Sequence, residues 1–256
     1  MSYAPINNPP QYSDNPEQSQ YGETGIDNIP DDFKYDTNVS GCELSIRQQF
    51  IKKVYTLLFL QLLITGAIGA FISLNQSVQN FALTNIWLFF VSIAGSIGFL
   101  IAAYVQSKNY PVNLILLTGF TVFEGYIIGV ATSLYDTQIV LEALTITLVV
   151  FIGLTLFAFQ SKYDFTSWAG VLNSVLFCMI GISFIWFFFQ PSSTAELVYS
   201  SIGAIVFSGY ILVDTQLILR KYNVEEEVPA AISLYLDIIN LFLNILRILS
   251  ASQNDN

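Results

Sequence analysis

AAISLYLDIINLFLNILRILS, residues 230–250, is long and apolar enough to cross a bilayer, yet it carries five polar side chains. At about 100° of rotation per residue in an α-helix, these side chains fall within an arc of roughly 80°. They are Ser233, Asp237, Asn240, Asn244 and Arg247. A polar and charged stripe is costly in contact with lipid, so it must face other helices or a polar interior. The stripe therefore predicts that this last helix lies at the centre of a membrane-embedded helical bundle.

The composition of the chain is that of an integral membrane protein. Of its 256 residues, 54% are hydrophobic and only 11% are charged, which is unlike an ordinary soluble domain. The net charge of −10 and the lack of a basic patch argue against nucleic-acid binding. With two cysteines and no histidine, neither a disulfide framework nor a histidine-based metal or catalytic site is expected. We expect no cofactor and no enzymatic activity. Without histidine, any proton sensing must use carboxyl groups.

Seven apolar segments follow an acidic, proline-rich tail. Each segment has roughly the 20 residues that a hydrocarbon core of about 30 Å requires. They are residues 54–74, 86–105, 111–134, 139–159, 168–189, 197–219 and 230–250. The sequence thus predicts an all-α protein with a disordered tail over residues 1–46 and a seven-helix transmembrane domain over residues 47–256.

The tail contains the sequence Pro9-Pro10-Gln11-Tyr12, a PPxY pattern. Proline-rich segments of this kind are already extended and dock into the aromatic grooves of WW-type domains. A WW-domain ubiquitin ligase is the partner that this pattern predicts, with Pro9, Pro10 and Tyr12 as its contact residues. The alternative is a proline-rich tail that contains a tyrosine without such a role.

The basic residues predict the orientation of the chain, because lysine and arginine mark cytosolic loops. With seven spans, eight of the nine bases lie on one side of the membrane, and Arg247 lies within the last span. The eight are Lys34, Arg47, Lys52, Lys53, Lys108, Lys162, Arg220 and Lys221. We expect a cytosolic N-terminus and a C-terminus in the lumen or outside.

Two carboxyl groups lie on consecutive spans at similar depth. Asp214 and Asp237 are about 8 and 10 Å from the cytosolic ends of their helices, at 1.5 Å of rise per residue. If they face each other, they cannot both ionise cheaply and should titrate as a unit. Alternatively, each acid is satisfied separately, for example Asp214 by Arg220 or Lys221. A third acid, Glu124, lies near the middle of its span, where buried acids are usually functional.

Three motifs around these acids resemble the transmembrane Bax inhibitor motif family, most closely its Lifeguard branch. They are FQSKYDFTS at 159–167, DTQLIL at 214–219 and LYLDIINLF at 234–242. The acidic tail, FKY at 33–35 and LNILRIL at 243–249 are similar to the yeast member of the family. The resemblance covers essentially the whole chain.

This resemblance implies a seven-helix fold with a central last helix, and membership of a group of proteins that protect against cell death. It also implies a pH-sensitive calcium leak from an internal store, the endoplasmic reticulum or vacuole, with Asp214 and Asp237 as the sensor pair. Bacterial members place an arginine in the second helix as a partner for the pair. The span at 86–105 has no basic residue, so another group must take that place.

A cation leak is the function that we expect, ahead of a membrane adaptor and an intramembrane aspartyl protease. Calcium prefers six to eight oxygen ligands, so the two aspartates predict weak binding suited to permeation. The expected route is lined by Asn240, Asn244, Glu124 and Arg247. An adaptor that acts through its tail and cell-death regulators would leave the buried acids unexplained. An intramembrane aspartyl protease would carry a GxGD motif, and Asp237 is preceded by Leu234-Tyr235-Leu236 instead.

Overall fold

The computed structural model describes residues 39–41, 44–186 and 188–254, and all its regular elements are helices. They are η2 (Val39–Gly41), α1 (Leu44–Leu74), α2 (Gln76–Thr84), α3 (Ile86–Val105), α4 (Val112–Thr132), α5 (Thr137–Gln160), η3 (Phe165–Trp168), α6 (Ala169–Trp186), α7 (Ser193–Arg220) and α8 (Glu227–Asn254). Seven candidate spans are long and apolar enough to cross a membrane, η3 and α6 together forming one of them. The predicted all-α, seven-span membrane fold is confirmed.

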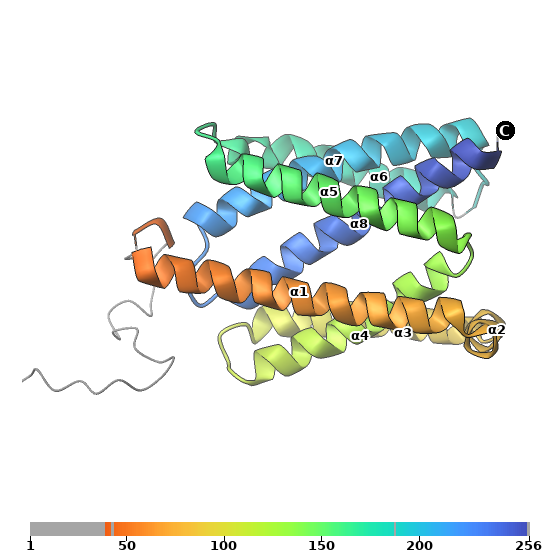
Figure 1. Cartoon of the computed structure of the whole chain (residues 1–256), viewed down its shortest axis with the longest axis horizontal. Helices are drawn as coiled ribbons and strands as arrows, with labels where there is room; N and C mark the ends of the chain where they lie inside the picture. Colours follow the sequence, from red (N-terminus) through yellow and green to blue (C-terminus); the bar gives the residue numbers. More distant parts are fainter. Residues whose placement is uncertain (1–38, 42–43, 187, 255–256) are drawn as a thin grey trace, which may run out of the picture.

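Helix α8 occupies the centre of the bundle, as the polar stripe predicts. In Figure 1 it passes diagonally between one group formed by α5, α6 and α7 and another formed by α1, α3 and α4. It contacts α7, α5, α1, α3 and α4, and its packing against α7 is the most extensive in which it takes part. In its most apolar window 61% of the residues are buried, against 6% for the span that contains α6. Helix α6 therefore faces lipid, whereas α8 faces protein.

Glycine residues allow α1 and α4 to pack backbone against backbone. A Cβ atom on Gly129 would lie 3.2 Å from the Cα atom of Gly69 and 2.7 Å from Cδ1 of Ile72. One turn earlier, a Cβ atom on Gly125 would lie 3.4 Å from the Cα atom of Thr65. Small residues at this spacing are the usual means of close approach between membrane helices.

The folded body begins earlier than the hydropathy pattern indicates. Helix α1 starts at Leu44, so a domain boundary after residue 46 falls inside its first turn. Val39 precedes it and is fully buried, and its N–H donates to the carbonyl oxygen of Tyr222 at 2.9 Å. Residues 39–41 therefore pack against the turn between α7 and α8. The PPxY motif lies outside the described residues.

The short helix α2 occupies a segment for which the sequence indicated only a loop. Asn75 starts it, because its side-chain oxygen accepts from the N–H groups of Ser77 and Val78. At nine residues α2 is too short to span a bilayer, so a search for apolar windows does not detect it.

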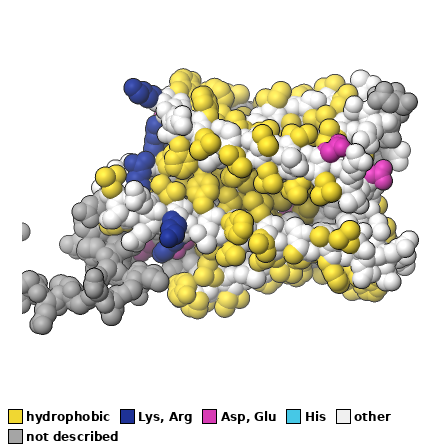
Figure 2. Space-filling model, viewed as in Figure 1, with side chains coloured by type: hydrophobic (Ala, Val, Ile, Leu, Met, Phe, Trp, Pro, Cys, Tyr) yellow, Lys and Arg dark blue, Asp and Glu magenta, His cyan; other side chains and the backbone are white. Residues whose placement is uncertain are grey.

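Successive spans run in opposite directions, so all the described bases except Arg247 gather at one end, here called the basic end. Figure 2 shows lysine and arginine side chains at that end and apolar side chains along the middle of the visible face. The basic end holds Arg47, Lys52, Lys53, Lys108, Lys162, Arg220 and Lys221. It also contains the start of α1 and the turn between α7 and α8, whereas α8 finishes at the opposite end (Figure 1).

Candidate functional site: the buried acid pair

The structure brings Asp214 of α7 and Asp237 of α8 together. Their carboxyl groups are in hydrogen-bonding contact. The Asp237 side chain is buried, with 7% of the residue exposed, and its Oδ2 atom has no hydrogen-bond partner among the described residues. Two carboxylates in such contact would repel each other strongly if both were ionised.

The nearby bases point away from the pair. Lys221 donates from Nζ to the Thr166 hydroxyl at 2.8 Å, and Arg220 reaches the carbonyl oxygen of Ser161. The pKa of Asp164 lies below its ordinary value because the Thr166 hydroxyl and N–H donate to its carboxylate, and the Lys221 and Arg220 charges add to this. In the described structure these two bases thus serve the α5–η3 linker rather than Asp214.

Gln216 fixes the same linker from within α7, and the sequence reasoning did not single it out. It is fully buried. Its Nε2 donates to the carbonyl oxygen of Tyr163 at 2.7 Å, and its Oε1 accepts from the N–H of Phe165 at 2.7 Å. A glutamine two residues after Asp214 in an apolar helix was the signal that could have identified it. Its side chain therefore ties the segment between α5 and η3 to α7, two residues after Asp214.

Three hydroxyl groups lie on the basic-end side of the pair. Ser233 is one helical turn before Asp237 on α8. Its Oγ atom is 3.4 Å from the hydroxyl of Tyr104 at the end of α3 and 3.3 Å from that of Tyr222 in the α7–α8 turn. Burial raises the pKa of Tyr222, as do the neighbouring charges of Asp214 and Glu226. The tyrosines were not predicted, because nothing in the sequence indicates that they converge.

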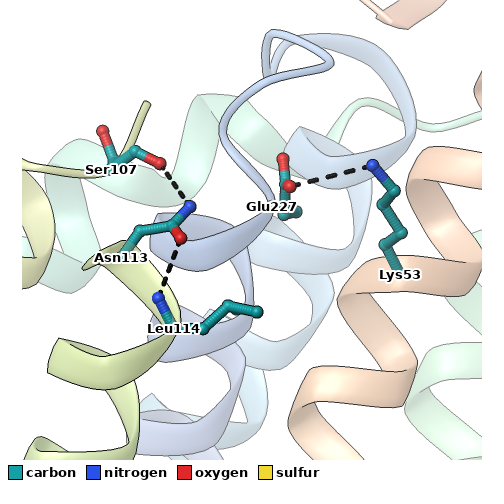
Figure 3. Close-up of polar contacts among 5 residues, drawn as sticks. All are labelled: Lys53, Ser107, Asn113, Leu114 and Glu227. Atoms are coloured by element: carbon teal, nitrogen blue, oxygen red, sulfur yellow. Dashed lines mark hydrogen bonds and ion pairs between the residues drawn. The ribbon is translucent and has the colours of Figure 1, made fainter. Parts of the chain in front are cut away.

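Two further polar contacts fix the basic end, and both are drawn in Figure 3. Lys53 of α1 forms an ion pair with Glu227 at the start of α8, with Nζ and Oε1 3.9 Å apart. Asn113, which is buried in the first turn of α4, donates to the carbonyl oxygen of Ser107 and accepts from the N–H of Leu114, both at 2.8 Å. These contacts tie α1 to α8 and close the loop between α3 and α4.

Beyond the pair, the predicted polar stripe is packed against protein. Asn240 and Asn244 donate to carbonyl oxygens of their own helix, at Leu236 and at Asn240, over 2.8 and 2.7 Å. Asn244 lies directly against Gly203 of α7, where a Cβ atom would lie 2.6 Å from the asparagine Cγ. The Oδ1 atom of Asn244 is buried without a hydrogen-bond partner among the described residues. In this structure the contact between Asn244 and Gly203 therefore leaves no space along the polar stripe at this position.

The other two residues expected along the route lie in different surroundings. Glu124 of α4 accepts a hydrogen bond from Ser96 of α3 at 2.7 Å, and no described contact joins it to the acid pair. Arg247 is half-buried on α8 and makes no ion pair within the described part of the chain. Neither Glu124 nor Glu142 pairs with Arg247 in the described structure. Glu124 accepts a hydrogen bond from Ser96, and Glu142 accepts one from Gln138.

A cation at the acid pair would find few charged ligands. Among the described residues, no three aspartate, glutamate or cysteine side chains come together in a preformed metal site. Asp214 and Asp237 supply two carboxyl groups, and Asn240 is the next polar side chain along the stripe, one turn beyond Asp237. Two carboxyl groups and one amide supply fewer oxygen ligands than the six to eight that a calcium ion prefers.

Comparison with known proteins agrees with the motifs in the sequence. Residues 47–255 match the family described as "Inhibitor of apoptosis-promoting Bax1". Bax inhibitor 1 of Schizosaccharomyces pombe is 38% identical, over 94% of this chain and 91% of its own length. Protein lifeguard 4 of Mus musculus is 40% identical, over 87% of this chain and 93% of its own length. The Golgi anti-apoptotic protein of vaccinia virus strain Lister is 38% identical, over 88% of this chain and 94% of its own length. The chain belongs to the Bax inhibitor family of integral membrane proteins.

Proposed function

We propose that the protein is a pH-sensitive calcium leak channel of an internal membrane, the endoplasmic reticulum or the vacuole. Its basic end would face the cytosol, in keeping with the rule that lysine and arginine stay on that side. Through the calcium content of the store it would take part in calcium homeostasis, stress responses and the control of programmed cell death. The contact between the Asp214 and Asp237 carboxyl groups carries this proposal.

The pair supplies a charge switch inside the bundle. With one shared proton, the two carboxyl groups hold α7 and α8 together. When cytosolic pH rises and this proton is lost, two negative charges lie side by side in a poorly solvated position, and their repulsion separates the helices. The same two charges then attract a divalent cation to the opened site, and acid reverses the change.

The stripe residues beyond the pair would form the remainder of the path. Asn240 and Asn244 offer amide oxygens once α8 moves away from Gly203, and oxygen atoms are the ligands that calcium prefers. Arg247 lies further toward the opposite end, where its positive charge opposes cation entry unless a carboxylate approaches it. Glu124 would contribute only after a rearrangement of α4, because it is held by Ser96 in the closed arrangement.

Calcium flux in liposomes tests the channel directly. The full-length protein is reconstituted with a calcium indicator inside the vesicles, and flux is followed from about pH 5 to about pH 8. We expect a leak above that of empty liposomes, which rises with pH on the basic-end side. A flux equal to that of empty liposomes at every pH would overturn the proposal.

A role as a membrane adaptor is the second candidate, and two observations favour it. The names of the relatives describe regulators of cell death rather than enzymes. The Pro9-Pro10-Gln11-Tyr12 motif provides a site for a WW-domain partner, such as a ubiquitin ligase that controls turnover. Binding of cell-death regulators by a variant that has lost calcium flux would distinguish this function from the channel.

A further inference from the structure

On the basic-end side of the acid pair, hydroxyl groups from three separate parts of the chain meet. Tyr104 comes from the last turn of α3, Tyr222 from the α7–α8 turn, and Ser233 from α8 itself. Both tyrosine hydroxyls meet the single Ser233 hydroxyl, at 3.4 and 3.3 Å. Since Ser233 precedes Asp237 by one turn, the three oxygens lie about 6 Å nearer the basic end than that acid.

The hydrogen-bonding capacity of Ser233 makes the two contacts interdependent. A serine hydroxyl has one donor hydrogen and two acceptor positions, and each tyrosine has one donor hydrogen. Either both tyrosines donate to Ser233, or one donates and the other accepts. Half-buried Tyr222 keeps its proton, because partial burial and the Asp214 charge raise its pKa, so it remains able to donate across the neutral range.

The position of Tyr222 is fixed by a segment that precedes α1. The N–H of Val39 donates to the Tyr222 carbonyl oxygen at 2.9 Å, and the Val39 side chain is fully buried in the main core. On the other side of the turn, Glu226 accepts from the N–H of Asn223 at 3.1 Å. The turn is therefore held at both ends, and its tyrosine is directed toward Ser233.

We propose that Tyr104, Ser233 and Tyr222 form a hydroxyl clasp that closes the basic-end entrance to the acid pair. The inference rests on the proposed channel function and adds a second barrier, separate from the carboxyl contact. For an ion to pass, both tyrosines must leave Ser233, which releases α3 from α8. The freed hydroxyl oxygens then face the path and are the kind of neutral ligand that calcium accepts.

Three substitutions remove the clasp without removing bulk: Tyr104→Phe, Tyr222→Phe and Ser233→Ala. Each is measured in the full-length protein in liposomes at about pH 6, where the acid pair is expected to be closed. Loss of one neutral hydrogen bond should raise the calcium leak by about two- to tenfold. Because both tyrosines use Ser233, the two Phe substitutions should have no further effect when they are added to Ser233→Ala.

Tyr199→Phe is the matched control. Its hydroxyl is 2.6 Å from Ser183, so the substitution removes a tyrosine–serine contact of the same kind between α6 and α7. That contact lies toward the opposite end of the bundle, away from the acid pair. We expect the leak of this variant to equal that of the wild type, and wild-type leak in all three clasp variants would overturn the proposal.

Hydrogen exchange separates the clasp from the channel function. In lipid nanodiscs, backbone amides of residues 222–233 should exchange several-fold faster in Tyr222→Phe and Ser233→Ala than in Tyr199→Phe. If wild-type liposomes carry no calcium flux, the channel proposal fails and this exchange alone decides whether the clasp exists. Equal exchange in all variants would overturn the clasp even where the wild-type channel conducts.

Discussion

The carboxyl group of Asp237 lies in hydrogen-bonding contact with that of Asp214 on the neighbouring antiparallel helix, and it is almost entirely shielded from solvent. The bases at the end of α7 contact Thr166 and Ser161 rather than this pair. No basic side chain in the described part of the chain forms an ion pair with either carboxyl group.

Asp214→Asn and Asp237→Asn should each flatten the pH dependence of calcium flux. Asparagine keeps the shape of the side chain but cannot acquire the negative charge that separates the helices. We expect flux at about pH 8 to fall by about tenfold, equivalent to about 1.4 kcal/mol of lost repulsion. The measurement is flux in liposomes across the neutral range.

Glu142→Gln is the control for the acid-pair variants, since this acid is exposed on α5 and, among the residues that the structure describes, bonds only to Gln138. It should retain wild-type flux and pH dependence. If both aspartate variants keep the wild-type pH dependence, the pair is not the sensor. A changed rate of calcium flux with the same pH dependence would mean that the two aspartates line the ion path but do not sense pH.

Gly203→Ala should disturb the contact that closes the polar stripe. The added methyl group overlaps the amide of Asn244, so the asparagine must move or α7 and α8 must separate. Overpacking of this kind typically costs about 1–3 kcal/mol of folding free energy. Thermal unfolding in detergent should therefore occur at a lower temperature than in the wild type.

Gly98→Ala is the control, because a Cβ atom there would meet nothing within 4 Å. Alanine is also the better helix former, so this variant should be as stable as the wild type or slightly more stable. Equal stability of the two alanine variants would contradict the close contact between Gly203 and Asn244.

Asp164 should contribute to stability at neutral pH and lose that contribution in acid. Its folded-state pKa is lowered by the Thr166 hydrogen bonds and by Lys221 and Arg220. A group with a depressed pKa stabilises the fold above its unfolded-state pKa of about 3.9, and the effect disappears as pH falls through the folded-state value. Asp164→Asn should thus be less stable than the wild type near pH 7, with the difference shrinking below about pH 4.

Asp136→Asn is the comparison for that experiment, since Asp136 precedes α5 without a side-chain capping bond. Its stability should follow the wild type at all pH values. Unfolding in detergent, measured at a series of pH values, gives both curves. A constant difference between Asp164→Asn and the wild type down to the lowest pH would argue against the depressed pKa.

A peptide of residues 1–46 should bind WW domains through Pro9-Pro10-Gln11-Tyr12, and Tyr12→Ala should weaken that binding by at least about tenfold. Fluorescence anisotropy with isolated WW domains measures both affinities. Ser13→Ala is the control, because this residue follows the motif. Equal affinity of the wild-type and Tyr12→Ala peptides would exclude the motif as the site.

Removal of the tail should leave calcium flux intact only if the deletion stops before Val39. This residue is buried and bonded to Tyr222, so a deletion that includes it removes part of the folded body. Deletion of residues 1–36 should therefore preserve the leak, whereas a chain that starts at residue 44 should leak more. A wild-type leak from the shorter chain would contradict the role of Val39.

The sequence by itself determined the spans and the position of each acid along its helix. Hydropathy over about 20 residues measures the length of chain that a bilayer covers, and helical periodicity places the five polar groups of the last span on one face. Because the cost of exposing such a face to lipid is large, the central position of α8 followed without knowledge of its neighbours. The meeting of Asp214 and Asp237 was one of two arrangements that these data allowed.

Only the tertiary structure decided which residues surround the pair. Hydropathy fixes the position of a residue along the membrane normal, but it carries no information on which helices are neighbours around that normal. The lateral arrangement depends on close packing, such as that of Gly129 against Gly69. The three hydroxyl residues Tyr104, Tyr222 and Ser233 belong to different elements of the chain, so no local pattern in the sequence predicts that they meet. Their convergence follows from the packing of the helices. The same packing separates Glu124 from the acid pair.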